Sequence, residues 1–319
     1  MRNPTRLLLA SLSLLVLGAC SGGPGSDAGA RGGTARDYTR TESDVTVLPN
    51  GTGWTATRTV TLDNDDAGAS RAAVSLRTVN GGVTSVAAAV PGDYQIEVTL
   101  QASAPTAEQA EEALATMQVQ HRDGTDPGAL YLDTEVEFAQ YQANNVNRSA
   151  AIAATLPADL DYDLYQSSIN GGASTSGLGG RQAQLFSTNG TVTLAGTWDD
   201  AAANSVNGSV SASGDIASLQ ASTLNGSVES SLSGARDSVA DLESSTGSID
   251  AAVNRTVGST FDLYGDTDVG SVTIVVAGTE PVGTPTSNSA HYRSPDYASG
   301  SPRVKITGRT STGSVTIHE

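Results

Sequence analysis

A short phrase that recurs through the C-terminal half of the chain constrains the fold more than any other feature. It consists of a Ser-, Thr- or Asn-rich approach, a glycine, and then a β-branched residue. The glycines of the phrase stand at 171, 190, 208, 226, 247, 270 and 313, so the first five steps are 19, 18, 18, 21 and 23 residues. An outlying copy is Asn80-Gly81. A step of this length is typical of architectures in which each repeat is one structural unit.

Two architectures can produce these repeats. An Asn-Gly pair between apolar residues is the strongest signal for a two-residue β-hairpin, because both turn positions need a positive φ. That reading predicts an antiparallel β-meander, closed as a sandwich or barrel. In the other reading, each repeat of about 20 residues is one coil of a β-solenoid, and the glycine marks the same corner of every coil.

The side chains of the repeats favour the solenoid. A sandwich core is about 10 Å thick and is filled by large side chains from two sheets. Between residues 189 and 243 the apolar side chains are Leu, Val, Ile and Ala, and Trp198 is the only aromatic residue. Such small side chains suit the narrow lumen of a solenoid. The last step of 43 residues contains four prolines, so we expect an excursion loop there.

The segment from residue 44 to residue 167 predicts strands and one helix. Apolar and polar residues alternate over residues 54–62 and 94–100, as in half-buried strands. Thr106 and Gln109 have the spacing of a capping box, which predicts a short helix near residues 106–117. We expect this β-rich part to continue into a repeat solenoid over residues 168–319, because Asn80-Gly81 already carries the repeat phrase.

The order of these segments resembles a known family. A helical segment at 107–114 is followed by Leu156-Pro157-Ala158, by residues 161–164, and then by the serial glycine phrases. From Thr78 to Ile317 this order is similar to a bacterial putative-adhesin family, a domain of unknown function. The resemblance implies a right-handed β-helix that is surface-exposed or periplasmic. It implies no catalytic residue.

The first residues predict export and lipidation. Arg2 and Arg6 precede an apolar run of eleven residues at 7–17, which is too short to span a bilayer comfortably. Gly18 and Ala19 then precede Cys20, a pattern that resembles the bacterial lipobox. The resemblance implies cleavage of residues 1–19 as a lipoprotein signal peptide. It also implies a diacylglycerol thioether on Cys20 that holds the protein at a membrane.

The segment after the lipidation site predicts a flexible tether. Residues 20–43 are rich in Gly, Ser and Ala, so we expect them not to pack. Ser21 is not the aspartate associated with inner-membrane retention, which favours the outer membrane if the organism has one. Cys20 is the only cysteine, so disulfides cannot stabilise the exported part.

Charge and composition exclude several functions. The chain has 34 acidic and 17 basic residues, and its net charge of −17 repels nucleic acid. Three histidines, His121, His291 and His318, lie in no recognisable catalytic or zinc motif, and 121–124 looks like a turn between strands. The acidic residues 63–66 offer oxygen ligands for calcium, but a solvated turn explains them better because the spacing of an EF-hand is absent.

No set of residues converges on catalysis. Asp215, Asp241 and Asp250 stand at different offsets from their repeat glycines, so they do not predict a carboxylate pair. We therefore assign no catalytic, metal or cofactor residue. We expect a lipid-anchored, non-enzymatic, adhesin-like interaction or scaffold protein of the bacterial cell envelope, with an envelope or extracellular protein or polysaccharide as partner. A carbohydrate-active β-helix enzyme and an envelope sensor accessory protein are the alternatives.

Overall fold

The computed structural model describes residues 34–89, 92–140 and 145–319. The chain is mainly β, as expected: within these ranges there are 23 strands and one helix, and the strands join into one large, open sheet. No helix of the described residues is long and apolar enough to cross a membrane. The predicted signal peptide and Cys20 lie outside the described residues.

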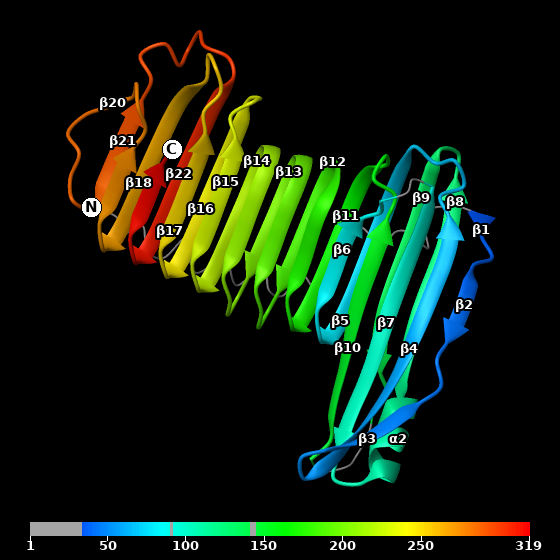
Figure 1. Ribbon diagram of the computed structural model, residues 1–319. Coiled ribbons are helices and arrows are strands. Elements are labelled where there is room, and N and C mark those ends of the chain that lie inside the picture. Colours follow the sequence, from blue (N-terminus) through cyan, green and yellow to red (C-terminus); the bar gives the residue numbers. More distant parts are fainter. Residues whose placement is uncertain (1–33, 90–91, 141–144) are drawn as a thin grey trace.

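The repeats stack in parallel (Figure 1). Each of the four strands β11 (Asp161–Asn170), β12 (Ala173–Ser187), β13 (Val192–Ser205) and β14 (Val210–Asn225) pairs in parallel with the next. One repeat is therefore one coil, as the solenoid reading predicts, and the repeat region is not an antiparallel meander. The right-handed sense of the coils stays a prediction.

Each coil has two sides, because the long strands bend at a glycine. The part of β14 before Gly214 pairs with β15 (Val228–Ser233), and the part after it pairs with β16 (Ser238–Thr246). A Cβ on Gly214 would lie 2.0 Å from the carbonyl oxygen of Gly196, the bend of the coil below. The glycines at this bend therefore let neighbouring coils approach.

We call the two sides the short-strand face and the long-strand face. The short-strand face holds the first parts of β12 to β14 together with β6 (Val83–Ala87), β15, β17 (Ile249–Asn254), β23 (Val315–His318) and β19 (Val272–Val275). The long-strand face holds their second parts together with β11, β16, β22 (Arg303–Thr312) and β18 (Thr260–Val269).

Columns of small aliphatic side chains fill the space between the faces. One buried column on the short-strand face runs through Val83, Ala173, Val192, Val210, Val228, Ile249 and Val315. Near the C-terminal end the faces are so close that a Cβ on Gly265 would lie 2.5 Å from Cγ1 of Val272. The expectation of a narrow lumen is thus confirmed.

The repeat glycines form a second corner. A Cβ on Gly190 or Gly208 would lie 2.3 Å from the carbonyl oxygen of the preceding repeat glycine. Two hydrogen-bonded ladders run along this corner. In the outer ladder Asn207 Nδ2 donates to Asn189 Oδ1 at 2.8 Å, and the same bond joins the other members, Asn80, Asn170 and Asn225. In the inner ladder a buried hydroxyl donates to the preceding glycine carbonyl, as Ser205 does to Gly190 at 2.9 Å.

The last coil of the sequence is not the last coil of the stack. The strands β22 and β23 lie between β16–β17 and β18–β19, so β18 and β19 end the stack. The segment expected to be an excursion loop also contains β20 (Glu280–Pro281) and β21 (Ser289–Arg293). Because β21 pairs with β18, this segment covers the end of the long-strand face instead of forming a plain loop.

The N-terminal part, which we call the body, is largely antiparallel. Its long strands β4 (Gly53–Asp65), β7 (Asp93–Ala104) and β10 (Asn147–Leu156) pair with one another, and β2 (Thr39–Glu42) and β3 (Thr46–Asn50) flank β4. A hairpin of β8 (Met117–Asp126) and β9 (Ala129–Phe138) covers the other side, with β1 (Thr34–Ala35) at its edge. The antiparallel alternative thus describes the body and not the repeats.

The body and the stack share one sheet. The strand β5 (Arg71–Asn80) pairs with β11, and β6 pairs with both β10 and β12. The expected boundary at 167/168 falls inside β11. The tether expectation is wrong for residues 34–42, because β1 and β2 pair with β8 and β4 there.

The helix α2 (Ala107–Ala115) lies where the capping-box spacing predicts it. Thr106 is the N-cap, and its hydroxyl accepts a hydrogen bond from the backbone N of Gln109 at 3.2 Å. The helix buries Ala110, Ala113 and Leu114 at the far end of the long body strands (Figure 1).

Candidate functional site

One outward row of mostly hydroxyl side chains crosses the body and the whole short-strand face. Its members lie in register on twelve hydrogen-bonded strands, and eight of them are Ser or Thr. In order across the sheet they are Thr41, Thr61, Glu97, Ala153, Thr84, Ser174, Thr193, Ser211, Glu229, Asp250, Thr316 and Thr273. At a strand spacing of about 4.8 Å this polar row is about 50 Å long.

Alternation along the strands explains why the row faces outward. In β7 the buried residues Tyr94, Ile96 and Val98 point into the core, so Gln95 and Glu97 point away from it. The same alternation holds in β13, where Val192 and Leu194 are buried and Thr193 is exposed. Sequence repeats alone did not reveal the row, because strands far apart in the sequence contribute to it.

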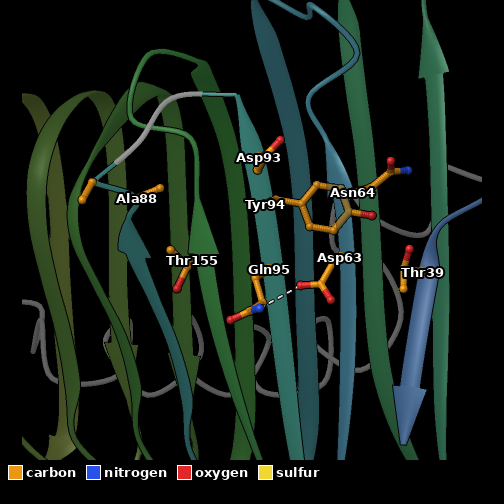
Figure 2. Close-up of a pocket in the computed structure, with 9 residues that line it drawn as sticks. Thr39, Asp63, Asn64, Ala88, Asp93, Tyr94, Gln95 and Thr155 are labelled. Atoms are coloured by element: carbon orange, nitrogen blue, oxygen red, sulfur yellow. Dashed lines mark hydrogen bonds between the residues drawn. The ribbon is translucent and has the colours of Figure 1, made fainter.

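A hollow of about 500 Å³ lies on the body at one end of this face (Figure 2). Its lining residues are Thr39, Asp63, Asn64, Ala88, Ala89, Asp93, Tyr94, Gln95 and Thr155. Four of them are register partners on the neighbouring strands β2, β4, β7 and β10, and they form a second row beside the polar row: Thr39, Asp63, Gln95 and Thr155. Gln95 Nε2 donates to Asp63 Oδ1 at 2.8 Å, which fixes both planar groups.

The charge of the hollow limits what it can bind. The lining carries two carboxylates, Asp63 and Asp93, and no Lys, Arg or His. An anion would have to approach two negative charges without a counter-charge, so the hollow suits a neutral or cationic ligand.

A buried network supports the hollow from below. Tyr94 Oη donates to Asp123 Oδ2 at 2.7 Å, and Asn64 Nδ2 donates to the same oxygen at 2.8 Å. Arg36 Nη1 lies 3.4 Å from the other oxygen, Asp123 Oδ1. Burial, together with the hydrogen bond to Asp123, raises the pKa of Tyr94 far above its ordinary value. The phenol therefore stays protonated and fastens β7 to β8 on the core side of the sheet, beneath the row of Asp63 and Gln95.

His121 belongs to the same network. Its Nδ1 lies 2.8 Å from Thr134 Oγ1, its Nε2 lies 3.4 Å from Tyr94 Oη, and its ring packs edge-on against Tyr38. Burial lowers the pKa of His121 to about 4, so the ring is neutral at pH 7. The expectation that 121–124 is a turn is wrong: these residues lie inside β8, because its pairing with β9 continues through them.

The other two histidines hold acidic partners that are distant in the sequence. His291 Nε2 lies 2.6 Å from Asp262 Oδ1, and Arg293 donates to both oxygens of Asp262 at 3.0 Å. Burial alone would raise the pKa of Asp262, but the bonds from Arg293 and His291 outweigh it and hold the pKa below its ordinary value. His318 Nε2 lies 3.0 Å from Asp250 Oδ1. The first of these clusters fastens β21 to β18.

The three aspartates weighed as carboxylate candidates do not meet. Asp241 points outward from the long-strand face and Asp250 from the short-strand face, while Asp215 pairs with Arg236 at 3.0 Å. The register brings Glu229 beside Asp250, a pair that the sequence offsets missed, but it lies on the open polar row. Among the described residues, no three His, Cys, Asp or Glu side chains are placed to hold a metal ion.

The last two residues of the acidic segment 63–66 stabilise the end of β4 and the turn after it. Asp65 Oδ1 accepts from the backbone N of Ala67 at 3.0 Å, and Asp66 Oδ1 accepts from Gly68 at 2.8 Å. Arg36 pairs with Asp65. These contacts belong to an Asx-type turn that begins where β4 ends. The turn interpretation is therefore wrong for residues 63–65, which lie in β4 and pair with β7, and it describes only the residues that follow.

Comparison with known proteins gives structural neighbours only. No family model matches the sequence, and no curated protein matches it. A putative cell adhesion protein from Clostridium sporogenes aligns with 88% of this chain and 99% of its own, at 9% identity and a TM-score of 0.37. A putative adhesin from Bacteroides fragilis aligns with 81% and 96%, at 16% identity and a TM-score of 0.30. A putative adhesin from Parabacteroides distasonis covers the same shares, at 12% identity and a TM-score of 0.29. TM-scores of this size do not establish a shared fold, so membership of the putative-adhesin family stays a prediction.

Proposed function

We propose that this protein is a lipid-anchored, non-enzymatic protein of the bacterial cell envelope that binds an extracellular polysaccharide in an adhesin-like manner. The polar row carries the proposal, because it runs in register across twelve strands of the body and the stack, and eleven of its twelve members are polar, Ala153 being the exception. The row offers hydroxyl and carboxylate groups at the regular spacing of a sheet. A polymer with repeating hydroxyl groups suits such a surface.

The affinity of such a surface for a polymer comes from many weak contacts. A single exposed hydrogen bond adds only about 1 kcal/mol, since it replaces a bond to water. A polymer that engages several strands at once gains from effective concentration without any single deep pocket. This reasoning fits a flat row better than it fits a compact protein partner.

The anchor belongs to the same proposal. The predicted lipidation site Cys20 precedes β1 by 14 residues, which span at most about 50 Å when extended. The body would then lie near the membrane, and the stack would carry the polar row away from it. Cys20→Ala should move the protein from the membrane fraction to the soluble fraction. Continued membrane association would contradict the anchor.

Retention on immobilised polysaccharides tests the binding. Liposomes carrying the acylated full chain should be retained on at least one neutral polysaccharide. Thr193→Lys with Ser211→Lys should abolish retention, because two long side chains would interrupt adjacent strands of the row. Gln184→Lys with Ala202→Lys is the matched control, since this pair occupies adjacent strands of the same sheet on the long-strand face. Equal loss in both pairs, or no retention of the wild type, would overturn the proposal.

A polymer cleavage assay tests the non-enzymatic part. The purified full chain should leave the chain length of the retained polysaccharide unchanged during a long incubation. Reproducible depolymerisation would instead support a carbohydrate-active enzyme.

A further inference from the structure

We infer that the hollow on the body is a binding site for a neutral sugar unit, with Asp63 and Gln95 as its principal hydrogen-bonding pair. This inference rests on the proposed function and deepens it, because it assigns one saccharide subsite to a defined place beside the polar row.

The free polar atoms of the hollow point to a ligand with several hydroxyl groups. Asp63 uses Oδ1 to accept from Gln95, and within the described residues Asp63 Oδ2 and Gln95 Oε1 make no hydrogen bond. Thr39 and Thr155 extend the same register row on either side. Neighbouring strands are about 4.8 Å apart, so the row offers carboxylate, amide and hydroxyl groups across the width of a sugar ring.

The size of the hollow favours a small organic molecule over an ion. Its volume of about 500 Å³ lies in the range of small-molecule sites. A calcium ion needs six to eight oxygen ligands at about 2.3–2.6 Å, which requires a tight cage of carboxylates and carbonyls. No group of three acidic or histidine side chains of the described chain is placed for that.

Charge selects the kind of sugar. Asp63 and Asp93 line the hollow without a cationic side chain, so a uronic or sialic acid would meet repulsion. A neutral sugar can donate its hydroxyl protons to these carboxylates, and hydrogen bonds to charged acceptors are stronger than neutral ones.

Hydrogen bonds keep the hollow in shape before a ligand binds. Asn64 and Tyr94 both donate to the buried Asp123, which fastens β4 and β7 to β8 on the core side of the sheet, beneath the hollow. On the outer side, the hydrogen bond from Gln95 to Asp63 restricts both of these side chains. Binding of a ligand therefore orders fewer side chains, and the entropy cost of binding is smaller than on a surface of free side chains.

Titration calorimetry of the full chain with maltose, cellobiose, lactose and N,N′-diacetylchitobiose tests the inference, with glucuronic acid and calcium chloride as separate probes. At least one neutral disaccharide should bind saturably. Asp63→Ala and Gln95→Ala should each weaken that binding roughly tenfold, the loss expected from one hydrogen-bonding group at a charged pair. Asp241→Ala and Gln220→Ala should leave it unchanged, because that Asp–Gln pair is also in register on adjacent strands but lies on the long-strand face, away from the hollow.

Three outcomes would overturn the inference. They are no saturable binding of any neutral disaccharide, binding that survives both hollow variants, and calcium binding that Asp63→Ala abolishes. The first two would leave the proposed function standing if liposomes are still retained on polysaccharide. Disaccharide binding without polymer retention would instead support the hollow and refute the proposed function of the row.

Discussion

The same dipeptide, Asn-Gly, has a different role in the body and in the stack. In the body, Asn50-Gly51 joins β3 to β4, Gly51 has a φ of +61°, and a Cβ there would meet nothing within 4 Å. In the stack, Gly208 has no left-handed φ, and a Cβ would lie 2.3 Å from the Gly190 carbonyl oxygen. Glycine supplies a backbone conformation in the first case and closeness between coils in the second.

This difference extends to the way each region is held together. The body depends on long antiparallel pairings such as β4 with β7, which span twelve residue pairs. The stack depends on contacts between neighbouring coils, repeated at each corner. A change at a corner of the stack therefore acts on an interface between coils, and a change at the β3–β4 turn acts on one hairpin.

Gly208→Ala should give the largest loss of stability. Its Cβ would collide with backbone atoms of the coil below, which cannot rotate away, so we expect the free energy of unfolding to fall by about 3 kcal/mol or more. Gly51→Ala should cost only about 1 kcal/mol, the price of a left-handed conformation in open space. Urea denaturation of each full-length variant measures the difference.

Asparagine substitutions sharpen this test. Asn tolerates the left-handed region, so Gly51→Asn should be nearly neutral. Gly208→Asn should be as damaging as Gly208→Ala, because the collision involves Cβ itself. Equal effects of Asn at the two positions would show that the two corners do not differ in the way described.

Acid should affect the body through His121. The pKa of His121 is lowered to about 4 in the folded chain and returns to about 6.5 on unfolding, so between these values the unfolded state binds more protons. Stability is therefore lost as the pH falls from about 6.5 to about 4, by roughly 3 kcal/mol from this residue. Free energies of unfolding at pH 7 and pH 4.5 should show a smaller difference in His121→Gln than in the wild type.

His318→Gln is the control for that measurement. His318 lies at the chain end, where its ring contacts the exposed Asp250. His121→Gln should reduce the difference between pH 7 and pH 4.5 more than His318→Gln does, because the ring of His121 is buried within the body and that of His318 is exposed. If both variants flatten the pH dependence equally, burial of His121 is not its cause.

Local signals were sufficient for some elements and not for others. The start of α2 depends on a bond within one turn, from the backbone N of Gln109 to the Thr106 hydroxyl, so the local sequence predicted it correctly. The Asp-Gly pair at 123–124 looks like a turn, but pairing with β9 keeps it in a strand. No local pattern indicates that β22 inserts between β16 and β18, because the repeat phrase is similar in every coil and does not specify the order in which the coils stack. The hollow was missed for a related reason, since its central row takes one residue from each of four strands.

The asparagine side chains give the smallest contrast between the regions. Asn207 takes part in two ladder bonds of 2.8 Å, one to Asn189 and one from Asn225, whereas Asn50 donates only to Thr55 Oγ1 at 3.2 Å. Exposed hydrogen bonds of this kind are worth about 0.5–1 kcal/mol each, so Asn207→Ala should cost roughly 1–2 kcal/mol and Asn50→Ala about 0.5 kcal/mol. Urea denaturation in parallel with the glycine variants measures both.

Asn207→Asp is the more discriminating substitution, because a carboxylate can still accept from Asn225 but can no longer donate to Asn189. It should retain about half of the ladder contribution, and a cost equal to that of Asn207→Ala would mean that the two bonds act only as a unit.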